Sequence, residues 1–385
     1  MSSPASKPKR TRGQNHFVGE WFGQRIYPEV QLDKASLRTL KSERCPFLSL
    51  ATGKNEPCIK PAASRGVCTI TSRDGLLYER AGDSIDWLVC PYRTLDPMLL
   101  EEIARRLFEV DEASEVFIPA AVTLGEDPVR SRVRQLLDSG GRVFAYFRAR
   151  LGGEISLSPT DRSPEFAFDI TLVELEDNGT DQPEIGRYAV VEIQTMEFHG
   201  SYSAATTALV AALDLHSNFA SEIKANPEWA GRKIQGPSIA DTFKRTFYQM
   251  VFKFQLGIHE HCAGCALALP RSVWNTWQRH LGRPTLTPVV GDSKLFTLSK
   301  PESVSLTEAA TAWIVVFDTD MSVGSSPNPL PVDLVVQTGA PTLVHYAFDV
   351  APEEALGGGA TDALYADICA RVLTWWPELR HLGAD

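Results

Sequence analysis

The spacing of apolar residues changes along the first half of the chain, and each change marks a different predicted element. Residues 95–108 are apolar at helical spacing. A second helix is predicted from Asp127 as its N-cap, with Pro128 in the first turn and Gly140 as its stop. Two helices are therefore expected before the chain turns to strands.

From Val143 the apolar spacing falls to two residues, which is the period of a β-strand. Two longer apolar runs follow, at 166–175 and 187–196. The connection between them, 176–186, is polar and rich in Asp, Asn and Gly. This pattern predicts a β-hairpin with a long loop.

The second half of the chain alternates between the two spacings. The predicted helices are 204–223, 238–257 and 362–376. The predicted strands are 313–317, 334–337 and 343–350. Ser238 and Asp241 form the expected capping box of the second helix in this half. The fold class is therefore α/β, with the hairpin strands in the centre of the sheet.

The bulk composition is ordinary for a soluble globular protein. The chain has 385 residues, of which 43% are hydrophobic and 22% charged. Its formal charge is −10, from 38 basic and 48 acidic residues. Proteins that coat nucleic acid without sequence preference are usually basic throughout, so the charge argues against that class. A specific DNA enzyme is still allowed, because its positive charge need line only one cleft.

The N-terminal segment 1–14 carries basic residues but no apolar stretch. We expect residues 1–16 to form a disordered basic tail rather than a secretory signal. No uninterrupted apolar stretch approaches the roughly 20 residues that are needed to span a bilayer. The expectation is a cytoplasmic protein that does not enter a membrane.

Four of the seven cysteines lie in a segment dominated by loop-forming residues. They are Cys45, Cys58, Cys68 and Cys90. An odd number of cysteines without an export signal favours reduced thiols over a disulfide framework. A segment with few core-forming residues needs another source of stability, and four thiolates around a tetrahedral metal would supply it. Zinc and iron both suit such a site, and scattered buried thiols are the alternative.

The remaining cysteines give weaker patterns. Cys262 and Cys265 form a CAGC motif with His259 and His261 nearby. Both a second metal site and a pair of packed thiols near a helix end fit this spacing. Cys369 lies within the apolar pattern of the last predicted helix, so it is expected in the core.

Two acids and an amide lie on the predicted hairpin. Residues two apart in a strand share a face, so Glu192 and Gln194 point the same way. If the strands pair, Asp169 and Glu192 can hold one Mg²⁺ jointly while the third member orients a water molecule. This set suits hydrolysis of a phosphodiester. Surface acids on an edge strand are the alternative interpretation.

A series of short blocks between residues 17 and 285 carries a family likeness. The blocks are EWFGQRIYPEV (20–30), CPFL (45–48), SRGVC (64–68), DWLVCP (86–91), SPEFAFD (163–169), EIQTMEFHGSY (192–202) and FKRTFYQM (243–250). Taken in this order, they resemble the NotI-like type II restriction endonucleases.

The resemblance implies a PD-(D/E)xK nuclease core, in which helices flank a mixed central sheet, after an N-terminal metal module. It implies that Asp169 and Glu192 are metal ligands and that Glu154 is a further acid of the same site. Gln194 stands where most of that superfamily has lysine. An amide can hydrogen-bond a water molecule but cannot lower its pKa by charge, so more of that task falls to the metal.

The same resemblance implies that the four cysteines of the N-terminal module hold a single structural iron. It also implies a homodimer that cuts double-stranded DNA at a GC-rich palindrome and leaves 5′ overhangs. Direct attack of water on phosphorus would leave a 3′-hydroxyl and a 5′-phosphate.

Side chains that could contact DNA lie near these motifs. The candidates are Arg65, His199, Ser201, Tyr202, Lys244 and Arg245. Arginine and lysine fit the major-groove edge of guanine, which agrees with a GC-rich target. An ordinary surface or ion-pair role is the alternative for each. Trp274 and Trp277 are expected in the core or an interface.

The sequence therefore predicts three parts: the tail 1–16, a metal module at 17–125, and a catalytic and DNA-recognition domain at 126–385. The leading hypothesis is a Mg²⁺-dependent type II restriction endonuclease. A repair or mobile-element nuclease of the same fold is one alternative, and a non-catalytic DNA-binding protein with a structural metal is another.

Overall fold

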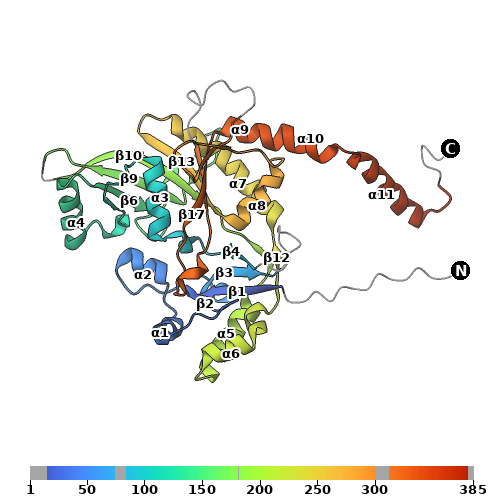
Figure 1. Cartoon of the computed structure of the whole chain (residues 1–385), viewed down its shortest axis with the longest axis horizontal. Helices are drawn as coiled ribbons and strands as arrows, with labels where there is room; N and C mark the ends of the chain where they lie inside the picture. Colours follow the sequence, from blue (N-terminus) through green and yellow to red (C-terminus); the bar gives the residue numbers. More distant parts are fainter. Residues whose placement is uncertain (1–14, 74–83, 181, 300–311, 380–385) are drawn as a thin grey trace.

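Two β-sheets of unequal size organise the chain (Figure 1). The computed structural model describes residues 15–73, 84–180, 182–299 and 312–379. Within them, a nine-stranded sheet has the order β14-β15-β17-β16-β13-β10-β9-β6-β5, and a four-stranded sheet has the order β2-β1-β3-β4. The helices lie on and around these sheets, so the molecule is a mixed α/β protein.

The nine-stranded sheet is mixed. Its strands are β5 (Val116–Phe117), β6 (Arg142–Phe147), β9 (Ile170–Glu176), β10 (Glu184–Ile193), β13 (Cys262–Pro270), β14 (Thr287–Pro288), β15 (Leu295–Thr297), β16 (Ala312–Phe317) and β17 (Val332–Thr338). Strands β6, β9 and β10 form an antiparallel run, whereas β10, β13 and β16 pair in parallel. A parallel pair needs a long crossover, and the segment between β10 and β13 provides it.

The four-stranded sheet is antiparallel and comes from the N-terminal part of the chain. Its strands are β1 (His16–Trp21), β2 (Gln24–Arg25), β3 (Val67–Ser72) and β4 (Ile85–Leu88). Two short ladders complete the described strands, β7 (Ser156–Leu157) with β8 (Phe166–Ala167) and β11 (Phe198–Gly200) with β12 (Ile234–Pro237).

Helices cover both faces of the large sheet. The α-helices are α1 (Lys34–Ser42), α2 (Pro46–Thr52), α3 (Pro97–Leu107), α4 (Asp127–Asp138), α5 (Ser203–Leu215), α6 (Phe219–Ala225), α7 (Ile239–Lys253), α8 (Arg271–His280), α9 (Ala340–His345), α10 (Ala351–Leu356) and α11 (Ala360–Trp375). Helix α3 packs on one face of the sheet, and helices α7 and α8 pack on the other.

The alternation of side chains along β10 decides which residues meet which helix. Ala189 and Val191 belong to the core on the α3 side, whereas Val190 belongs to the core on the α7 side. Glu192 follows Val190 at a spacing of two, so it also faces α7. Strands covered on both faces must be apolar on both, and the run 189–191 is fully buried.

The predicted hairpin and most predicted helices match the structure, except that the first expected strand, 166–175, is divided into β8, which pairs with β7, and β9, which starts at Ile170. Strands β9 and β10 pair antiparallel, and the connection between them is shorter than expected, at 177–183. Asp127 is the first residue of α4 rather than its N-cap, because Glu126 takes the capping position. Gly140 ends that region with φ of +80°, a conformation that favours glycine.

Two predicted elements were wrong. The single helix expected at 204–223 is two helices, α5 and α6, with a break after Leu215. The strand expected at 343–350 is helical, because Pro341 at the start of α9 begins a helix that continues through the segment. The periodicity of such a short apolar run cannot show whether the segment is a strand or a buried helix.

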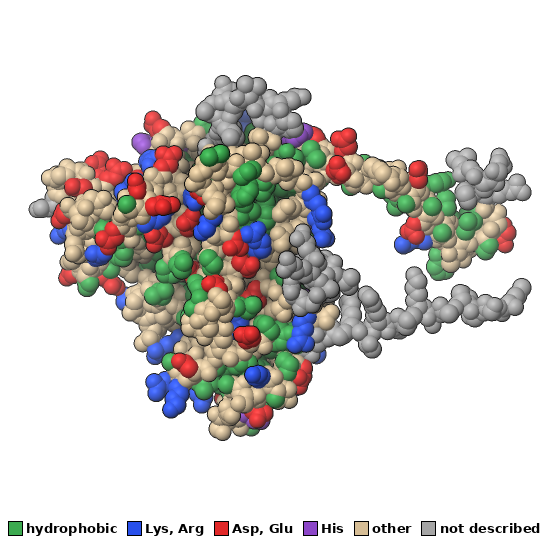
Figure 2. All heavy atoms as spheres, in the orientation of Figure 1, with side chains coloured by type: hydrophobic (Ala, Val, Ile, Leu, Met, Phe, Trp, Pro, Cys, Tyr) green, Lys and Arg blue, Asp and Glu red, His purple; other side chains and the backbone are tan. Residues whose placement is uncertain are grey.

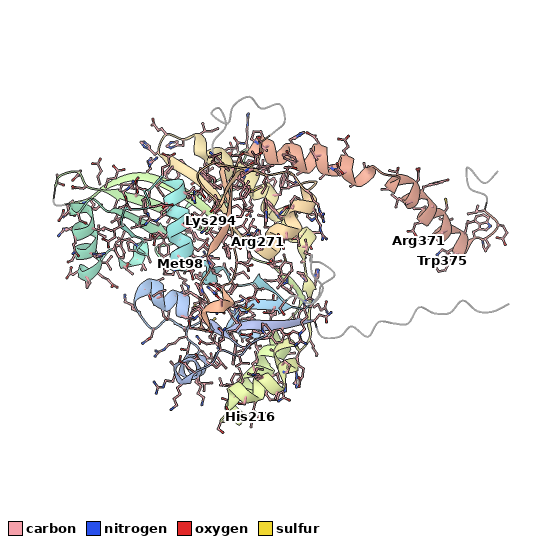
Figure 3. All side chains as sticks on the ribbon, viewed as in Figure 1. Met98, His216, Arg271, Lys294, Arg371 and Trp375 are labelled. Carbon is pink, nitrogen blue, oxygen red and sulfur yellow. The ribbon has the colours of Figure 1, made fainter. Side chains whose placement is uncertain are left out.

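Helices α10 and α11 extend away from the two sheets as an arm (Figure 1). Figure 3 shows Arg371 and Trp375 on this arm, apart from the rest of the molecule. No residue of α11 is buried, so Cys369 is not in the core as expected from its apolar neighbours. Trp274 and Trp277, by contrast, are buried as predicted. None of the helices in the described ranges is long and apolar enough to cross a membrane.

A buried network of charges joins the two sheets. Arg93 donates to both carboxylate oxygens of Glu20, at 2.8 and 3.0 Å, and both residues are 0% exposed. Arg25, also 0% exposed, pairs with Asp86 at 2.7 Å and donates to Oδ1 of Asn328 at 2.9 Å. Asn328 lies in the connection from β16 to β17. The network therefore ties the four-stranded sheet to the large sheet.

Replacing Arg93 by methionine should lower the free energy of unfolding by about 3–5 kcal/mol, because it leaves the Glu20 charge buried with one partner removed. Urea denaturation followed by circular dichroism measures this change. Arg38→Met, at an exposed position of α1, is the matched control and should change little. Equal unfolding midpoints for both variants would show that the network does not stabilise the fold.

Candidate functional site

Asp169 and Glu192 come together because β9 and β10 pair. Ile170 lies opposite Val191 in the ladder, so the residue before β9 lies beside the end of β10. The backbone N–H of Ile193 donates to Oδ2 of Asp169 at 2.9 Å, and the N–H of Asp169 lies 3.4 Å from Oε1 of Glu192. Each acid is thus held by the backbone next to the other.

Gln194 continues the line of β10 beyond its last strand residue. Its N–H donates to the carbonyl of Ala268 at 2.9 Å, which keeps it in register with β13. Its side chain is fixed at both ends, because the amide oxygen accepts from the hydroxyl of Thr246 and the amide nitrogen donates to the carbonyl of Thr195. The amide is therefore oriented before any ligand binds.

These three side chains line one small pocket with a volume of about 30 Å³. Its lining residues are Asp169, Glu192, Ile193, Gln194, Thr246, Gln249, Met250 and Leu267. A polar pocket of this size has room for a water molecule or a small cation. The structure brings the two acids and the amide together, while their chemical roles stay predictions.

The electrostatics of the pocket centre on Glu192, which is 7% exposed. The pKa of its carboxyl is raised to about 7, because burial and the neighbouring charge of Asp169 raise it more than Lys253 lowers it. The Nζ of Lys253 lies 2.6 Å from Oε2 of Glu192. Glu192 is thus a buried acid that is held by one basic partner.

Oxygen ligands for a hard cation are available in this arrangement. The contacts to Ile193 and Lys253 use Oδ2 of Asp169 and Oε2 of Glu192. Oδ1 of Asp169 and Oε1 of Glu192 are the oxygens that could ligate an ion. Carboxylates and water molecules are what Mg²⁺ prefers, so the donor set fits that metal.

Helix α7 contributes pocket residues that the sequence did not single out. The pocket is lined by Thr246, Gln249 and Met250 of this helix, and Lys253 contacts Glu192 beside it. Their spacing of three and four places them on one face of the helix, which was the available signal. The residues of this helix that the sequence suggests as DNA contacts are Lys244 and Arg245, and Lys244 is exposed.

Glu154 follows the Gly152–Gly153 turn after β6, is exposed, and does not belong to the residues that line the pocket. It directly precedes Ile155, whose carbonyl accepts from the N–H of Phe168 at 3.0 Å, next to the antiparallel ladder of β7 and β8. The segment that carries Glu154 therefore runs beside the segment that carries Asp169, while the role of Glu154 in the site stays a prediction.

The four N-terminal cysteines lie in one region. Cys45, Cys68 and Cys90 belong to the core on the α3 side, and Cys58 packs against it. The thiol of Cys68 hydrogen-bonds that of Cys90, which lowers the pKa of Cys90 to about 6 and raises that of Cys68. The N–H of Gly66 donates to Sγ of Cys58 at 3.4 Å. The thiols are thus close in space and form pairwise contacts.

A closed metal cage is not present in this arrangement. Across the described ranges, no three His, Cys, Asp or Glu side chains are placed so that they could hold a metal ion. The four cysteines fit a soft metal in number and chemical type, since thiolates select zinc or iron.

Cys262 and Cys265 lie at the start of β13, and their thiols hydrogen-bond each other. That bond lowers the pKa of Cys262 to about 7 and raises the pKa of Cys265. The thiol of Cys265 also donates to the carbonyl of Lys253 at 3.2 Å. This is the packed-thiol arrangement that was one of the two expectations.

The DNA-contact candidates lie on several different elements. Arg65 pairs with Glu43 at 3.0 Å, and Arg245 pairs with Glu197 at 2.8 Å. Both pairs are exposed, so each arginine can exchange its partner at small cost. Tyr202 packs against the core of the four-stranded sheet and α5, and burial raises its pKa to about 12.

Two basic surfaces were not singled out from the sequence. Figure 2 shows lysine and arginine side chains gathered over α1, where Lys34, Arg38 and Lys41 are exposed. A groove of about 780 Å³ along α5 is lined by small residues together with Arg232 and Lys233. Ser201 belongs to this groove, and His199 lies on the neighbouring strand β11.

Comparison of the chain with protein-family models and with curated proteins found no match.

The carboxyl of Glu192 should titrate near pH 7 in the metal-free protein, since burial and the charge of Asp169, partly offset by Lys253, raise its pKa from 4.5 to about 7. Carbon NMR of protein labelled at the glutamate carboxyls measures this directly, and Glu192→Gln should remove that resonance and no other. If every glutamate carboxyl titrated at its ordinary pH, the burial of Glu192 would have no electrostatic effect.

Proposed function

We propose that the protein is a Mg²⁺-dependent type II restriction endonuclease that hydrolyses double-stranded DNA. The observation that carries this proposal is the meeting of Asp169, Glu192 and Gln194 in one pocket at the ends of β9 and β10. The sequence blocks that resemble the NotI-like endonucleases contain all three residues. Neither observation depends on the other.

The core proposed for this activity is the part of the chain from α4 to β13. In order, it comprises α4, the antiparallel strands β6, β9 and β10, helix α7, and β13 parallel to β10. A mixed sheet with helices on both faces agrees with the PD-(D/E)xK core that the resemblance implies. In this core β10 presents its acid and its amide to α7.

Asp169 and Glu192 would hold the Mg²⁺ through their carboxylate oxygens. When bound, the metal supplies positive charge that offsets the charge of the scissile phosphate and makes a water molecule a better nucleophile. Gln194, fixed by Thr246, presents a neutral amide that can orient that water by a hydrogen bond. Attack on phosphorus would leave a 5′-phosphate and a 3′-hydroxyl.

Basic surfaces support the proposal that DNA is the substrate. Lys34, Arg38 and Lys41 on α1, together with Arg65, supply exposed positive charge on a chain whose net charge is −10. Phosphate contacts fix the position of a duplex, and base contacts select its sequence. A GC-rich palindrome cut with 5′ overhangs would need a homodimer with two such sites.

The cysteines are proposed to hold a structural metal, iron or zinc. Cys45, Cys68 and Cys90 belong to the same core as residues of α3 and the large sheet, so a metal there would brace the N-terminal part of the chain. The role is separate from catalysis.

Asp169→Ala and Glu192→Ala should each lower the rate of DNA cleavage by at least about 100-fold, because the loss of a ligand should exceed the 10- to 100-fold effect of losing a residue that only supports one. Cleavage of a plasmid with GC-rich palindromes in Mg²⁺ measures the rate, and a gel shift in Ca²⁺ measures binding, which should persist. Glu112→Ala, at an exposed position, is the control.

The products of the same digestion separate the alternatives. Discrete fragments support the restriction endonuclease. Nicking or smearing would favour a repair or mobile-element nuclease, and a gel shift without cleavage would favour a DNA-binding protein. Either acid variant cutting at the wild-type rate would refute the assignment of that residue.

Cys68→Ser should remove the bound metal and lower the melting temperature, whereas Cys369→Ser on the exposed arm should do neither. Elemental analysis measures the metal, and the absorption spectrum distinguishes coloured ferric thiolate from colourless zinc. Unchanged metal content in Cys68→Ser would exclude that residue from the site.

A further inference from the structure

Lys253, at the end of α7, is a buried base next to the acid pair. It is 4% exposed, and its Nζ lies 2.6 Å from Oε2 of Glu192. The same nitrogen donates to the carbonyl of Ala167 at 2.7 Å. Ala167 is the last residue of β8, two positions before Asp169. One ammonium group therefore bridges the segment that carries the first acid and the strand that carries the second.

The surroundings of Lys253 fix its position. The ammonium lies 5.7 Å from the centre of the Phe168 ring, between Ala167 and Asp169. The backbone carbonyl of Lys253 accepts from the thiol of Cys265 in β13 at 3.2 Å. The helix end, the acid segment and two strands of the sheet all meet at this residue. The orientation of its side chain toward Glu192 is therefore fixed by the surrounding packing.

Both acids are anchored by the protein. Oδ2 of Asp169 accepts from the backbone of Ile193, and Oε2 of Glu192 contacts Lys253. The second oxygen of each then has a defined direction, and Oε1 of Glu192 lies 3.4 Å from the N–H of Asp169. If Lys253 is replaced, the described contact that remains for the carboxylate of Glu192 is the longer one to the N–H of Asp169.

The charge of Lys253 has no counterpart among the pocket residues. Apart from the two acids, the residues that line the pocket are neutral, and Gln194 presents an uncharged amide. The basic side chain that contacts the acid pair therefore comes from α7 and not from β10. Loss of a group that orients a metal ligand typically lowers metal affinity or activity by roughly 10- to 100-fold.

We propose that Lys253 is the positioning residue of this site: it anchors Oε2 of Glu192, aims Oε1 at the cation, and supplies the fixed positive charge that the strand lacks. This inference rests on the proposed function, since it assigns a role within the same site. Gln194 orients water, and Lys253 orients the acid, so the two tasks belong to different elements.

The test measures cation binding as well as cleavage. Mn²⁺, whose free form is observed by electron paramagnetic resonance, replaces Mg²⁺ as the probe. Lys253→Met should weaken Mn²⁺ binding about 10- to 100-fold and slow single-turnover cleavage by at least that factor. Lys253→Arg should recover part of both, because it retains the charge. Thr242→Val is the matched control on the same helix, since Thr242 is 1% exposed and contacts Met196 instead of the pocket.

The inference fails if Lys253→Met is folded by circular dichroism and binds Mn²⁺ as tightly as Thr242→Val does. Where Lys253→Met does not fold, Lys253→Gln decides, because it retains a donor for Ala167 without the charge. Wild-type affinity for Mn²⁺ in that variant would likewise overturn the role.

The wild-type protein separates this inference from the proposed function. If it binds Mn²⁺ but cuts no DNA, the nuclease is refuted, and weaker binding by Lys253→Met still supports the positioning role. If its Mn²⁺ binding is no tighter than that of Glu192→Gln, the site holds no cation and both proposals fall.

Discussion

The burial of the Glu192 carboxylate is the constraint that explains the candidate site. An ionised carboxylate inside a protein costs several kcal/mol unless a partner compensates for the lost water. Lys253 is that partner, and it can reach Glu192 because α7 belongs to the crossover between β10 and β13 and packs on the face of the sheet that carries Glu192. A parallel pair of strands requires a crossover connection, and the helix in this connection, α7, covers the acid.

The two sheets form one connected structure rather than independent parts. Glu20, Arg25 and Arg93 are all completely buried, and Arg25 also bonds Asn328 in the loop before β17. Cys45, Cys68 and Cys90 pack in the same core as residues of α3 and the large sheet. In addition, β5 at 116–117 pairs with β6, so the large sheet includes residues from both sides of position 125. A metal in the cysteine cluster would therefore act on the support of the large sheet as well.

Local patterns in the sequence were sufficient for the hairpin and for α7. The period of two and a polar connection predicted β9 and β10, and the spacing between Glu192 and Gln194 placed both on one face. Lys253 could not be recognised in this way, because its contact with Glu192 depends on how α7 lies over the sheet. The prediction of a strand at 343–350 was wrong, because an unbroken apolar run has no periodicity that would distinguish a strand from a helix. The prediction that Cys369 lies in the core was wrong, because the apolar spacing in α11 does not show whether another element covers that helix.

Under the proposed function, the charges around the pocket make DNA binding at this point depend on the cation. Asp169 and Glu192 when ionised, together with Lys253, sum to a formal charge of −1, from two carboxylates and one ammonium. A DNA phosphate is repelled by that charge, and few other charges are near, since the remaining lining residues are neutral. A divalent ion changes the local sum to +1 and turns repulsion into attraction. The basic surface of α1 can hold the duplex in either state, because phosphate contacts there do not involve the pocket. Binding without cleavage in the absence of a catalytic cation then follows from the separation of these two surfaces.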